Sequence, residues 1–410
     1  MPSFDLNEAP SLLHLRTLVR VADHRTFSGA ARKMLRTASV VHDGIVELER
    51  QLGVALFERF PGGWQLTPEG TCVVCRARRI LAELAVLPAL LGQPPVTVHE
   101  QLYLLNARRL GAFVMLCRVR NMGRVAKALS VTQPAISSAV KTLETGTDKV
   151  LFERSGRGAQ PTEMALAILP PITRALNELG HIEADLAALQ GRLSGKVRVG
   201  ALPLSRTRLL PVAVVALLDR YPHVQVETFE GTFEQLETDL RAGDLDVLCG
   251  ALRDPGDSEL TGEVLLHESL VIVVRSGHPL LGRASALADL HAAQWIMPRP
   301  QTPARRLVEQ AFQAQHLELP MPCVESGDMA IIRGLLARSD WLALVSRHQF
   351  ETDVASGELA VLPVELPATR RAIGLIIRRH ALHPPAVTAM IEALRATTLG
   401  EGESGEEGAA

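Results

Sequence analysis

The amino-acid sequence predicts an α+β multidomain fold. Two tandem copies of a mainly helical unit, each followed by a long helix, precede a two-lobed α/β domain. Residues 15–67 are repeated without a gap by residues 110–162, with 14 of 53 paired positions identical. After residue 195, short apolar runs alternate with helical patterns. An ungapped repeat of this length indicates a duplicated folding unit, and strand-helix alternation indicates an α/β domain with a mostly parallel sheet.

The duplicated half divides into residues 11–95 and 96–190. Each repeat unit runs into a long helical pattern, Thr71–Leu91 in the first copy and Glu163–Leu189 in the second. Gly92-Gln93-Pro94-Pro95 ends the first of these patterns, because Gly and Pro interrupt helices. Gly191 to Gly195 predicts a short hinge before the third domain, which we place at residues 191–400.

The third domain is predicted from runs of two periodicities. Alternating or apolar runs predict strands at Lys196–Gly200, Val224–Glu227, Leu245–Cys249, Leu270–Val274, Trp295–Met297, Leu342–Val345, Leu359–Leu362 and Gly374–Ile377. Helical patterns lie between them at Leu209–Arg220, Phe233–Ala242, Ala304–Gln315 and Met329–Ala337. About 200 residues arranged in this way can form two small α/β lobes with a cleft between them.

Composition narrows the class of protein. The 410 residues have a net charge of −2 and 47% apolar residues, which is ordinary for a folded protein and argues against a polycation. The N-terminus lacks the pattern of a signal peptide, and no apolar run is long enough to span a membrane. We therefore expect a cytoplasmic protein without membrane contact, ending in a disordered acidic tail at residues 401–410. Cys72 and Cys75 form one C-x-x-C, interpreted as buried helix thiols, and we expect no cofactor and no metal.

The second copy predicts a helix-turn-helix. Val125–Leu129 forms a short helix, Ser130-Val131 a tight turn, and Thr132 caps a second helix with Pro134 in its first turn. Apolar residues at 136, 140 and 143 face inward. The outward face then presents Gln133, Pro134, Ser137, Ser138 and Lys141. Amide, hydroxyl and ammonium groups on one helix face can contact base edges and phosphates in a major groove.

A wing follows this helix. Leu151-Phe152-Glu153-Arg154 reads as a strand that leads into Ser155-Gly156-Arg157-Gly158, so that Arg154 and Arg157 can reach phosphates or an adjacent groove. Residues 106–158 hold ten Lys or Arg against three Asp or Glu, a local charge of +7. A capped amphipathic helix with a solvated face would explain the helix alone. The helix, the wing and the charge together favour binding to double-stranded DNA.

The first copy keeps the core and changes the surface. Its inward positions are Val41, Ile45 and Leu48, but the outward face becomes Ala38, Ser39, His42, Asp43 and Val46. The equivalent window, residues 11–63, holds eight Lys or Arg against five Asp or Glu, only +3. Because acidic groups repel phosphates, we predict that the second copy supplies most of the DNA affinity. The first copy would serve assembly or make weaker, non-standard contacts.

These residues resemble the LysR-type transcriptional regulators. The resemblance lies in Thr132-Gln133-Pro134-Ala135-Ile136-Ser137 and Leu151–Arg154, and in later segments such as Gly195–Gly200, Tyr221-Pro222 and His278-Pro279-Leu280. It covers residues 11–395 and implies winged helix-turn-helix modules, a linker helix at Glu163–Leu189 that mediates dimerisation, and a periplasmic-binding-protein-like domain that senses a small molecule. We therefore expect a homo-oligomer, a dimer or a tetramer.

The resemblance also carries over individual residues. The positions that contact bases in the family correspond here to Gln133, Pro134, Ser137 and Ser138, with Arg157 in the wing. This sequence departs from the family pattern at two places: Ser138 stands where Arg is usual, and Thr147-Asp148 replaces the usual Leu-Gly. Segments 200–207, 248–255 and 298–303 look like the subfamily of the galactose-binding-protein regulator. That similarity implies a sugar or a small organic acid as effector.

Candidate effector-binding residues lie where strands lead into helices, because helix N-termini and strand ends collect polar groups around a cleft. Three segments have this position, and two arginines could pair with a carboxylate. The set is Pro203, Leu204, Ser205, Thr207, Thr232, Arg253, Arg299, Thr302, Ser326 and Asp328. The alternative is that the Ser, Thr and Asp residues are ordinary helix caps and that the arginines form surface ion pairs.

Enzyme motifs do not support another function. Ser138-x-x-Lys141 has a nucleophile-base spacing but lies in the recognition helix without partner motifs, so we assign no catalytic residue. The sequence therefore predicts a ligand-responsive, DNA-binding transcriptional regulator. The alternative is a DNA-architectural or assembly protein whose solute-binding-like domain has no sensing role.

Overall fold

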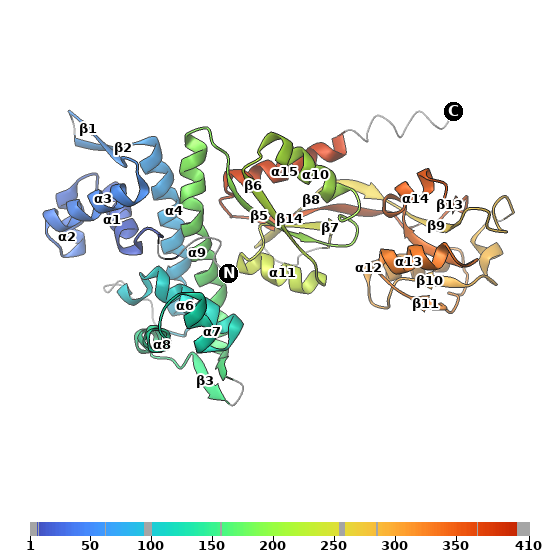
Figure 1. Ribbon diagram of the computed structural model, residues 1–410, viewed down its shortest axis with the longest axis horizontal. Coiled ribbons are helices and arrows are strands. Elements are labelled where there is room, and N and C mark those ends of the chain that lie inside the picture. The colour runs from blue at the N-terminus through green and yellow to red at the C-terminus, as the bar shows by residue number, and fades with distance from the viewer. Residues whose placement is uncertain are drawn as a thin grey trace.

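In the computed structural model, both copies of the repeat have the same order of elements (Figure 1). The structure describes residues 6, 8–61, 63–93, 101–155, 158–253, 259–283, 286–366 and 368–399. The first copy contains α1 (Leu12–His24), α2 (Phe27–Met34), α3 (Ala38–Leu52), β1 (Phe57–Phe60), β2 (Gly63–Leu66), α4 (Pro68–Ala85) and the short α5 (Leu87–Leu90). The second contains η1 (Leu102–Leu104), α6 (Ala107–Val119), α7 (Met122–Ala128), α8 (Gln133–Thr147), β3 (Phe152–Ser155), β4 (Gly158–Pro161) and α9 (Glu163–Leu189).

A glutamate at equivalent positions of the two copies makes the same hydrogen bonds to the start of each wing. The Glu49 carboxylate on α3 accepts hydrogen bonds from the backbone N–H groups of Leu56 (2.7 Å) and Phe57 (3.4 Å). Glu144 on α8 does the same for the N–H groups of Leu151 (2.9 Å) and Phe152 (3.2 Å). Each carboxylate thus satisfies backbone donors at the start of a wing strand and fixes the wing against the helix.

The end of each wing is built alike as well. Thr67 caps α4 and Thr162 caps α9, and each hydroxyl also donates to a carbonyl before the wing, over 2.7 and 2.9 Å respectively. Gly63 and Gly158 begin the returning strands with φ of +130° and +100°. Only glycine adopts these values without strain, so the tight wing turn requires it at both positions.

One local prediction about the second copy needs correction. Thr132 stands at the N-cap of α8, but its hydroxyl makes no capping hydrogen bond. The Ala135 N–H donates instead to the backbone carbonyl of Thr132 at 3.0 Å, and the Thr132 side chain is exposed. Thr147 and Asp148, the departures from the family pattern, fit the fold. Asp148 ends α8 at φ +50°, a conformation that Asp tolerates, and the buried Thr147 hydroxyl donates to the Leu143 carbonyl at 2.8 Å.

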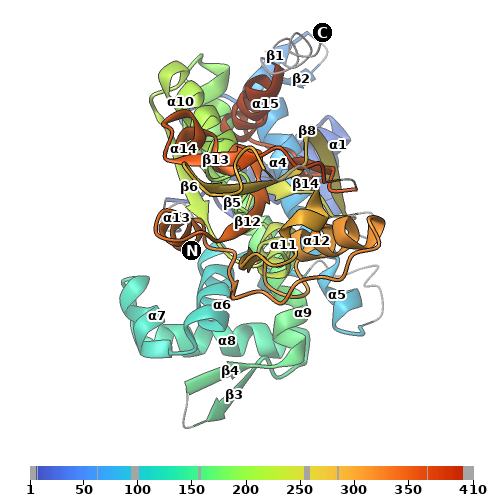
Figure 2. The same cartoon turned by 90° about the vertical axis from the view of Figure 1, so that its right-hand side faces the viewer.

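Helices α4 and α9 pack side by side and antiparallel, and the two copies lie at opposite ends of the pair (Figures 1 and 2). Each copy sits at the N-terminal end of its own helix, so its wing points away from the wing of the other. Buried residues from both copies and both helices, from Leu6 to Leu186, form one continuous apolar cluster. The duplicated half is therefore one folded body with a shared core.

The C-terminal half forms two lobes, each around a five-stranded sheet. The first lobe holds β5 (Gly195–Ala201), β6 (Val224–Phe229), β7 (Val247–Ala251), β8 (Leu260–Glu268) and β14 (Arg371–Arg378), with α10 (Leu209–Arg220), α11 (Phe233–Ala242) and α15 (Pro385–Leu399). The second holds β9 (Leu270–Arg275), β10 (Trp295–Met297), β11 (Val324–Glu325), β12 (Leu342–Ser346) and β13 (Leu359–Leu362). Its helices are η2 (Leu287–Leu290), α12 (Pro303–Ala314), α13 (Met329–Leu336), η3 (Arg347–Gln349) and α14 (Glu351–Ala355).

In each sheet four strands run in one direction, as expected for a mostly parallel sheet, and one strand runs against them. The orders are β6-β5-β7-β14-β8 and β11-β10-β12-β9-β13, and β14 and β9 run antiparallel to both of their neighbours. The reason is that the chain crosses between the lobes twice, from β8 to β9 and from β13 to β14. Each returning strand enters its sheet against the direction of the parallel strands.

Candidate DNA-reading surface and effector cleft

The outward face of α8 is open to solvent, as predicted. Ile136, Val140 and Leu143 are buried beneath it. Thr132, Gln133, Pro134, Ser138 and Lys141 are exposed, and Ser137 is half-buried. The face carries amide, hydroxyl and ammonium groups and no carboxylate, which suits contact with base edges and phosphates.

The wing is only partly described. Strands β3 and β4 pair antiparallel from Phe152↔Pro161 to Ser155↔Gly158. Arg154 lies in β3, and Arg157 falls outside the described residues. The roles of both arginines in binding DNA therefore remain predictions.

The equivalent face of α3 has a different chemistry. Val41, Ile45 and Leu48 are buried below it, as in α8. On the surface, the Asp43 carboxylate lies 3.8 Å from the His42 imidazole and accepts a hydrogen bond of 3.4 Å from the Ser39 hydroxyl. The polar groups of this face thus turn toward an acidic residue of their own helix, and that residue repels a phosphate backbone.

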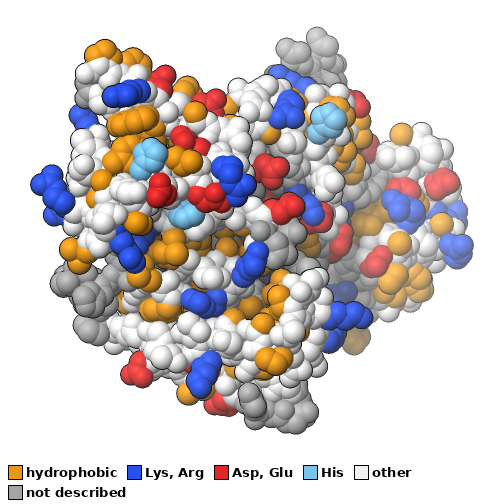
Figure 3. Space-filling view, turned by 60° about the vertical axis from the view of Figure 1, so that its left-hand side comes forward, with side chains coloured by type: hydrophobic (Ala, Val, Ile, Leu, Met, Phe, Trp, Pro, Cys, Tyr) orange, Lys and Arg blue, Asp and Glu red, His pale blue; other side chains and the backbone are white. Residues whose placement is uncertain are grey.

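The first copy also exposes apolar and aromatic groups. The Phe27 ring lies 5.6 Å from the His42 ring, 5.4 Å from Trp64 and 5.9 Å from Phe57, measured between ring centroids. Apolar side chains gather on the upper part of the surface, where this copy lies (Figure 3). The exposed ones in the first copy include Leu35, Val40, Val46, Phe60 and Trp64. The reading surface of the first copy is therefore more apolar than that of the second.

A small space separates the two lobes at their crossover. It measures about 20 Å³ and is lined by residues of both lobes and of the crossing strands: Leu204, Arg208, Leu209, Leu266, Glu268, His348, Ile373 and Thr397. A space of this size holds about one water, whereas small-molecule sites usually measure about 300–1,000 Å³. This space is therefore too small for a sugar or an organic acid.

Buried and exposed polar contacts hold the lobes in this arrangement. Glu268, at the end of β8, is buried, accepts a hydrogen bond from the Ser346 hydroxyl and forms an ion pair with Arg371 at 2.6 Å. At the surface, Arg208 of the first lobe pairs with Glu351 of the second at 2.9 Å. A ligand that enters between the lobes would compete with these contacts, which sequence reasoning missed because their residues lie far apart in the chain.

Three of the predicted effector residues act as helix caps. Thr232 accepts a hydrogen bond from the Gln235 N–H at 3.3 Å in a capping box of α11. Thr302 accepts the Arg305 N–H at 3.2 Å and caps α12, while Asp328 accepts the Ala330 N–H at 2.8 Å and caps α13. The capping alternative therefore accounts for all three side chains.

The other predicted effector residues divide between several places. Leu204 lines the space between the lobes, while Pro203, Thr207 and Arg299 are exposed. The Ser205 hydroxyl is buried within 2.9 and 3.1 Å of two backbone carbonyls, and the Ser326 hydroxyl accepts the N–H of a neighbouring cap residue. The Arg253 guanidinium pairs with a glutamate on α11 at 2.7 Å and lies 4.2 Å from the Phe233 ring. Leu204 is thus the predicted residue that the structure places at the interlobe space.

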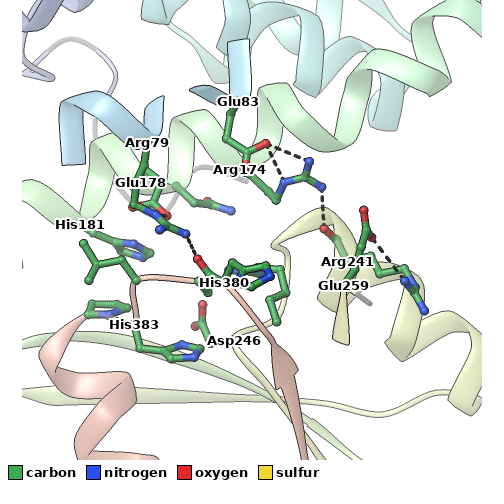
Figure 4. Close-up of a pocket in the computed structure, with 15 residues that line it drawn as sticks. Arg79, Glu83, Arg174, Glu178, His181, Arg241, Asp246, Glu259, His380 and His383 are labelled. Atoms are coloured by element: carbon green, nitrogen blue, oxygen red, sulfur yellow. Dashed lines mark hydrogen bonds and ion pairs between the residues drawn. The ribbon is translucent and has the colours of Figure 1, made fainter. Parts of the chain in front are cut away.

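A larger cavity lies where α4 and α9 meet the first lobe (Figure 4). It measures about 190 Å³, and its wall carries Arg79, Glu83, Arg174, Glu178 and His181 from the helices. The first lobe adds the segment 380–384, Arg241 of α11, Arg378 of β14, and Asp246 and Glu259, which precede β7 and β8. Sequence reasoning missed this cavity as well, because no local pattern links residues 79 and 384.

The wall of this cavity joins the helix pair to the effector lobe. The Asn177 amide donates to the Gly243 carbonyl at 2.6 Å, and the Arg174 guanidinium donates to the Arg241 carbonyl at 3.0 Å. Arg79 donates to the His380 carbonyl from the opposite side. Burial lowers the pKa of the His181 imidazole well below its usual value, and nearby guanidinium groups lower it further. Hydrogen bonds to backbone carbonyls therefore join the helix pair to the effector lobe, and the His181 imidazole lies in the wall of the cavity between them.

The two cysteines of the C-x-x-C motif both lie on α4. Cys72 is half-buried, and burial together with the charge of Asp185 raises the pKa of its thiol to about 11. Cys75 is exposed, which corrects the expectation that both thiols are buried. In the part of the chain that the structure describes, no cluster of His, Cys, Asp and Glu could hold a metal ion.

Both halves of the chain match models of known protein families. Residues 190–398 match the model of the LysR substrate binding domain, and residues 12–71 and 107–166 each match the model of the bacterial regulatory helix-turn-helix protein, lysR family. The chain belongs to the LysR family. It is a DNA-binding transcriptional regulator that responds to a small-molecule effector.

Relatives of known name differ in how much of this chain they match. The HTH-type transcriptional regulator GalR of Pseudomonas putida is 48% identical over 390 residues, which cover 95% of this LysR-family chain and 97% of GalR. The HTH-type transcriptional regulator PcaQ of Agrobacterium fabrum is 31% identical over 292 residues, covering 70% of this chain but 93% of PcaQ. This chain is therefore longer than PcaQ by about the size of one repeat copy, whereas GalR matches it along nearly its whole length.

Solved structures show the same fold. Full-length OxyR from Pseudomonas aeruginosa superposes with a TM-score of 0.58 at 22% identity, over 70% of this LysR-family chain and 93% of OxyR. CbnR complexed with its target DNA superposes with a TM-score of 0.50 at 24% identity, over 71% of this chain and 99% of CbnR. Within the described residues, no helix combines the length and the apolar character needed to cross a membrane.

Proposed function

We propose that this regulator reads DNA mainly through its second copy, between Thr132 and Arg157, and senses its effector in the cleft between the two lobes. Residues 11–95 and 96–190 would form two winged helix-turn-helix modules with their linker helices, and residues 191–400 would form the effector domain. The observation that carries the proposal is the contrast between two equivalent helix faces. The face of α8 presents exposed amide, hydroxyl and ammonium groups, whereas the face of α3 presents Asp43, Val40 and Val46.

The test compares one residue on each face. Duplexes that the wild-type chain selects from a random-sequence library serve as the DNA probe. Gln133→Ala should weaken binding by about 1–3 kcal/mol, because a glutamine amide can pair with an adenine edge at two points. His42→Ala is the matched control on α3 and should change affinity little. Equal losses for the two variants would contradict the division of labour between the copies.

We propose that the effector is a sugar or a small organic acid and that it binds when the lobes move apart. The 20 Å³ space between them is too small for either class of molecule in the arrangement seen. The contacts that join the lobes here, Ser346 with Glu268 and Arg208 with Glu351, are polar and can be replaced by hydroxyl or carboxylate groups of a ligand. The chain would then act as a cytoplasmic regulator without enzymatic activity.

A thermal-shift screen tests this second proposal. Sugars, aliphatic acids and aromatic acids are added one at a time, because a ligand that binds the folded state raises the unfolding midpoint. A hit that disappears in Glu268→Gln but persists in Glu259→Gln, a control at the junction cavity, would support the interlobe site. A broad panel without any hit would favour the architectural alternative, in which this domain has no sensing role.

A further inference from the structure

The contacts between α4 and α9 have the form of a two-fold dimer interface within one chain. Arg79 on α4 pairs with Glu178 on α9 at 3.1 Å, and Glu83 on α4 pairs with Arg174 on α9 at 2.9 Å. The repeat offset of 95 residues relates Arg79 to Arg174 and Glu83 to Glu178. The same ion pair is therefore made twice, once in each direction (Figure 4). Reciprocal contacts of this kind define an isologous interface between two equivalent surfaces.

The apolar stripe under these ion pairs obeys the same relation. The buried residues Val73, Ala77, Ile80 and Leu84 of α4 correspond, at the same offset, to four residues of α9 that are also buried: Ile168, Ile172, Ala175 and Leu179. Both helices thus present one face built on one plan. That face is already covered within the chain, because α4 and α9 contact each other along it and share one apolar cluster.

One buried ion pair breaks the symmetry. The Arg76 guanidinium, 1% exposed, contacts the Asp185 carboxylate at 2.6 Å and the Glu178 carboxylate at 2.5 Å. At the offset of 95 residues, Pro171 stands at the position of Arg76, and Leu90 at the position of Asp185. The symmetry-related contact would therefore join two apolar residues, and the ion pair exists only once.

This asymmetry distinguishes α4–α9 pairing from pairing of identical helices. If α4 paired with α4 of a second chain, Arg76 would face Leu90 in both halves and would lose one of its two carboxylates. If α9 paired with α9, Asp185 would face Pro171 twice and have no cation. The first arrangement leaves a buried cation with fewer partners and the second leaves a buried carboxylate with none, which disfavours both.

We propose that the linker-helix dimerisation surface of this regulator is satisfied within each chain, and that the Arg76–Asp185 pair selects this intrachain pairing over pairing of identical helices between chains. Oligomers of the chain then form through other surfaces. If the second copy is the main DNA reader, as proposed above, then the two non-identical modules of one chain take the place of the two identical modules of a dimer. The intrachain pairing of α4 and α9 does not depend on which copy reads DNA.

Cysteine cross-linking tests the pairing directly. The side chains of Glu83 on α4 and Arg174 on α9 contact each other at 2.9 Å and are partly exposed. In a full-length background in which Ser replaces Cys72, Cys75 and Cys323, a short bis-maleimide should link the double variant Glu83→Cys/Arg174→Cys within a single chain. Homotypic α4 pairing would place Glu83 opposite Arg79 of a second chain, so a mixture of Glu83→Cys chains and Arg79→Cys chains should give no linked dimer.

A mixing arm separates intrachain pairing from exchange of helices between chains. Chains with Glu83→Cys and chains with Arg174→Cys, carrying different tags, are co-expressed and treated with the same reagent, and no covalent heterodimer is expected. A second double variant, Arg79→Cys/Glu178→Cys, uses the reciprocal contact at 3.1 Å and covers the case in which the first fails to fold. Interchain products in either mixing arm, or failure of both double variants to link within the chain, would overturn the proposal. DNA is absent from every arm, so the result is independent of the DNA-reading assignment.

Discussion

The buried Arg76 side chain allows one prediction in which the magnitude follows from the structure. Its guanidinium is 1% exposed and approaches Asp185 at 2.6 and 3.1 Å and Glu178 at 2.5 Å. Burial alone would lower the pKa of Arg76, but the hydrogen bonds that it donates to Asp185 and the charge of Glu178 raise it above its usual value. Arg76→Met leaves Asp185 buried without a cation, while Glu178 keeps Arg79. Loss of one partner from a buried ion pair costs about 3–5 kcal/mol.

Removing both charges should recover most of that loss, because no unpaired ion remains buried. We therefore expect Arg76→Met/Asp185→Leu to lie within about 1–2 kcal/mol of the wild-type chain, and Arg76→Met alone to be the least stable of the three. Amide hydrogen exchange in peptides from α4 and α9 measures this local opening without treating a multidomain chain as two-state. The single variant should exchange about 10²–10⁴-fold faster, since each 1.4 kcal/mol is a factor of ten. Exchange as fast in the double variant as in the single variant would refute the reasoning.

Three further predictions concern pH, the wing and the DNA-binding surface. Burial holds the pKa of His181 well below that of the unfolded chain. The stability that the neutral imidazole contributes is therefore complete above about pH 6.5 and falls by up to about 1.4 kcal/mol per pH unit as the pH drops below that value. His181→Gln should remove this dependence and flatten a pH series of unfolding midpoints. Gly158→Ala should cost about 1–3 kcal/mol in thermal unfolding, because the added Cβ would meet a backbone oxygen at the end of α6, whereas Gly63→Ala, with an equally unusual φ but open space, should cost less. Lys141→Val should lower the slope of log affinity against log salt by about one, and adding Val46→Lys on α3 should not restore it; a restored slope would place both faces on DNA.

The fold could be predicted wherever a single element carries its own signal. The bounds Glu163–Leu189, Leu209–Arg220 and Phe233–Ala242 are those predicted, because apolar periodicity together with capping residues defines a helix locally. The sheets were harder. Strand β8 and helix α15 escaped prediction, and the antiparallel returns of β9 and β14 depend on where the chain crosses between lobes. A crossover of this kind leaves no periodic trace in the sequence.

The same distinction separates the sites. The reading face of α8 could be predicted because residues one turn apart on a helix share a face whatever surrounds them. The interlobe space could not, because Arg208, Glu268 and His348 come together only in the folded domain. Thr232 and Asp328 show why a position before a helix does not by itself predict a ligand contact. Their positions before helices are correct, but a polar residue at such a position satisfies the helix first.

Duplication within one chain removes a constraint that symmetry imposes on a homodimer. Two identical linker helices must make every contact twice, so a homodimer holds an ion pair such as Arg76–Asp185 either twice or not at all. Two non-identical helices can hold it once and thereby make the correct pairing more stable than either self-pairing. The same freedom extends to the reading faces. Once the helix pair forms within the chain, the face of α3 is no longer required to match that of α8, and Asp43 and Val46 can stand where Ser138 and Lys141 stand in the other copy.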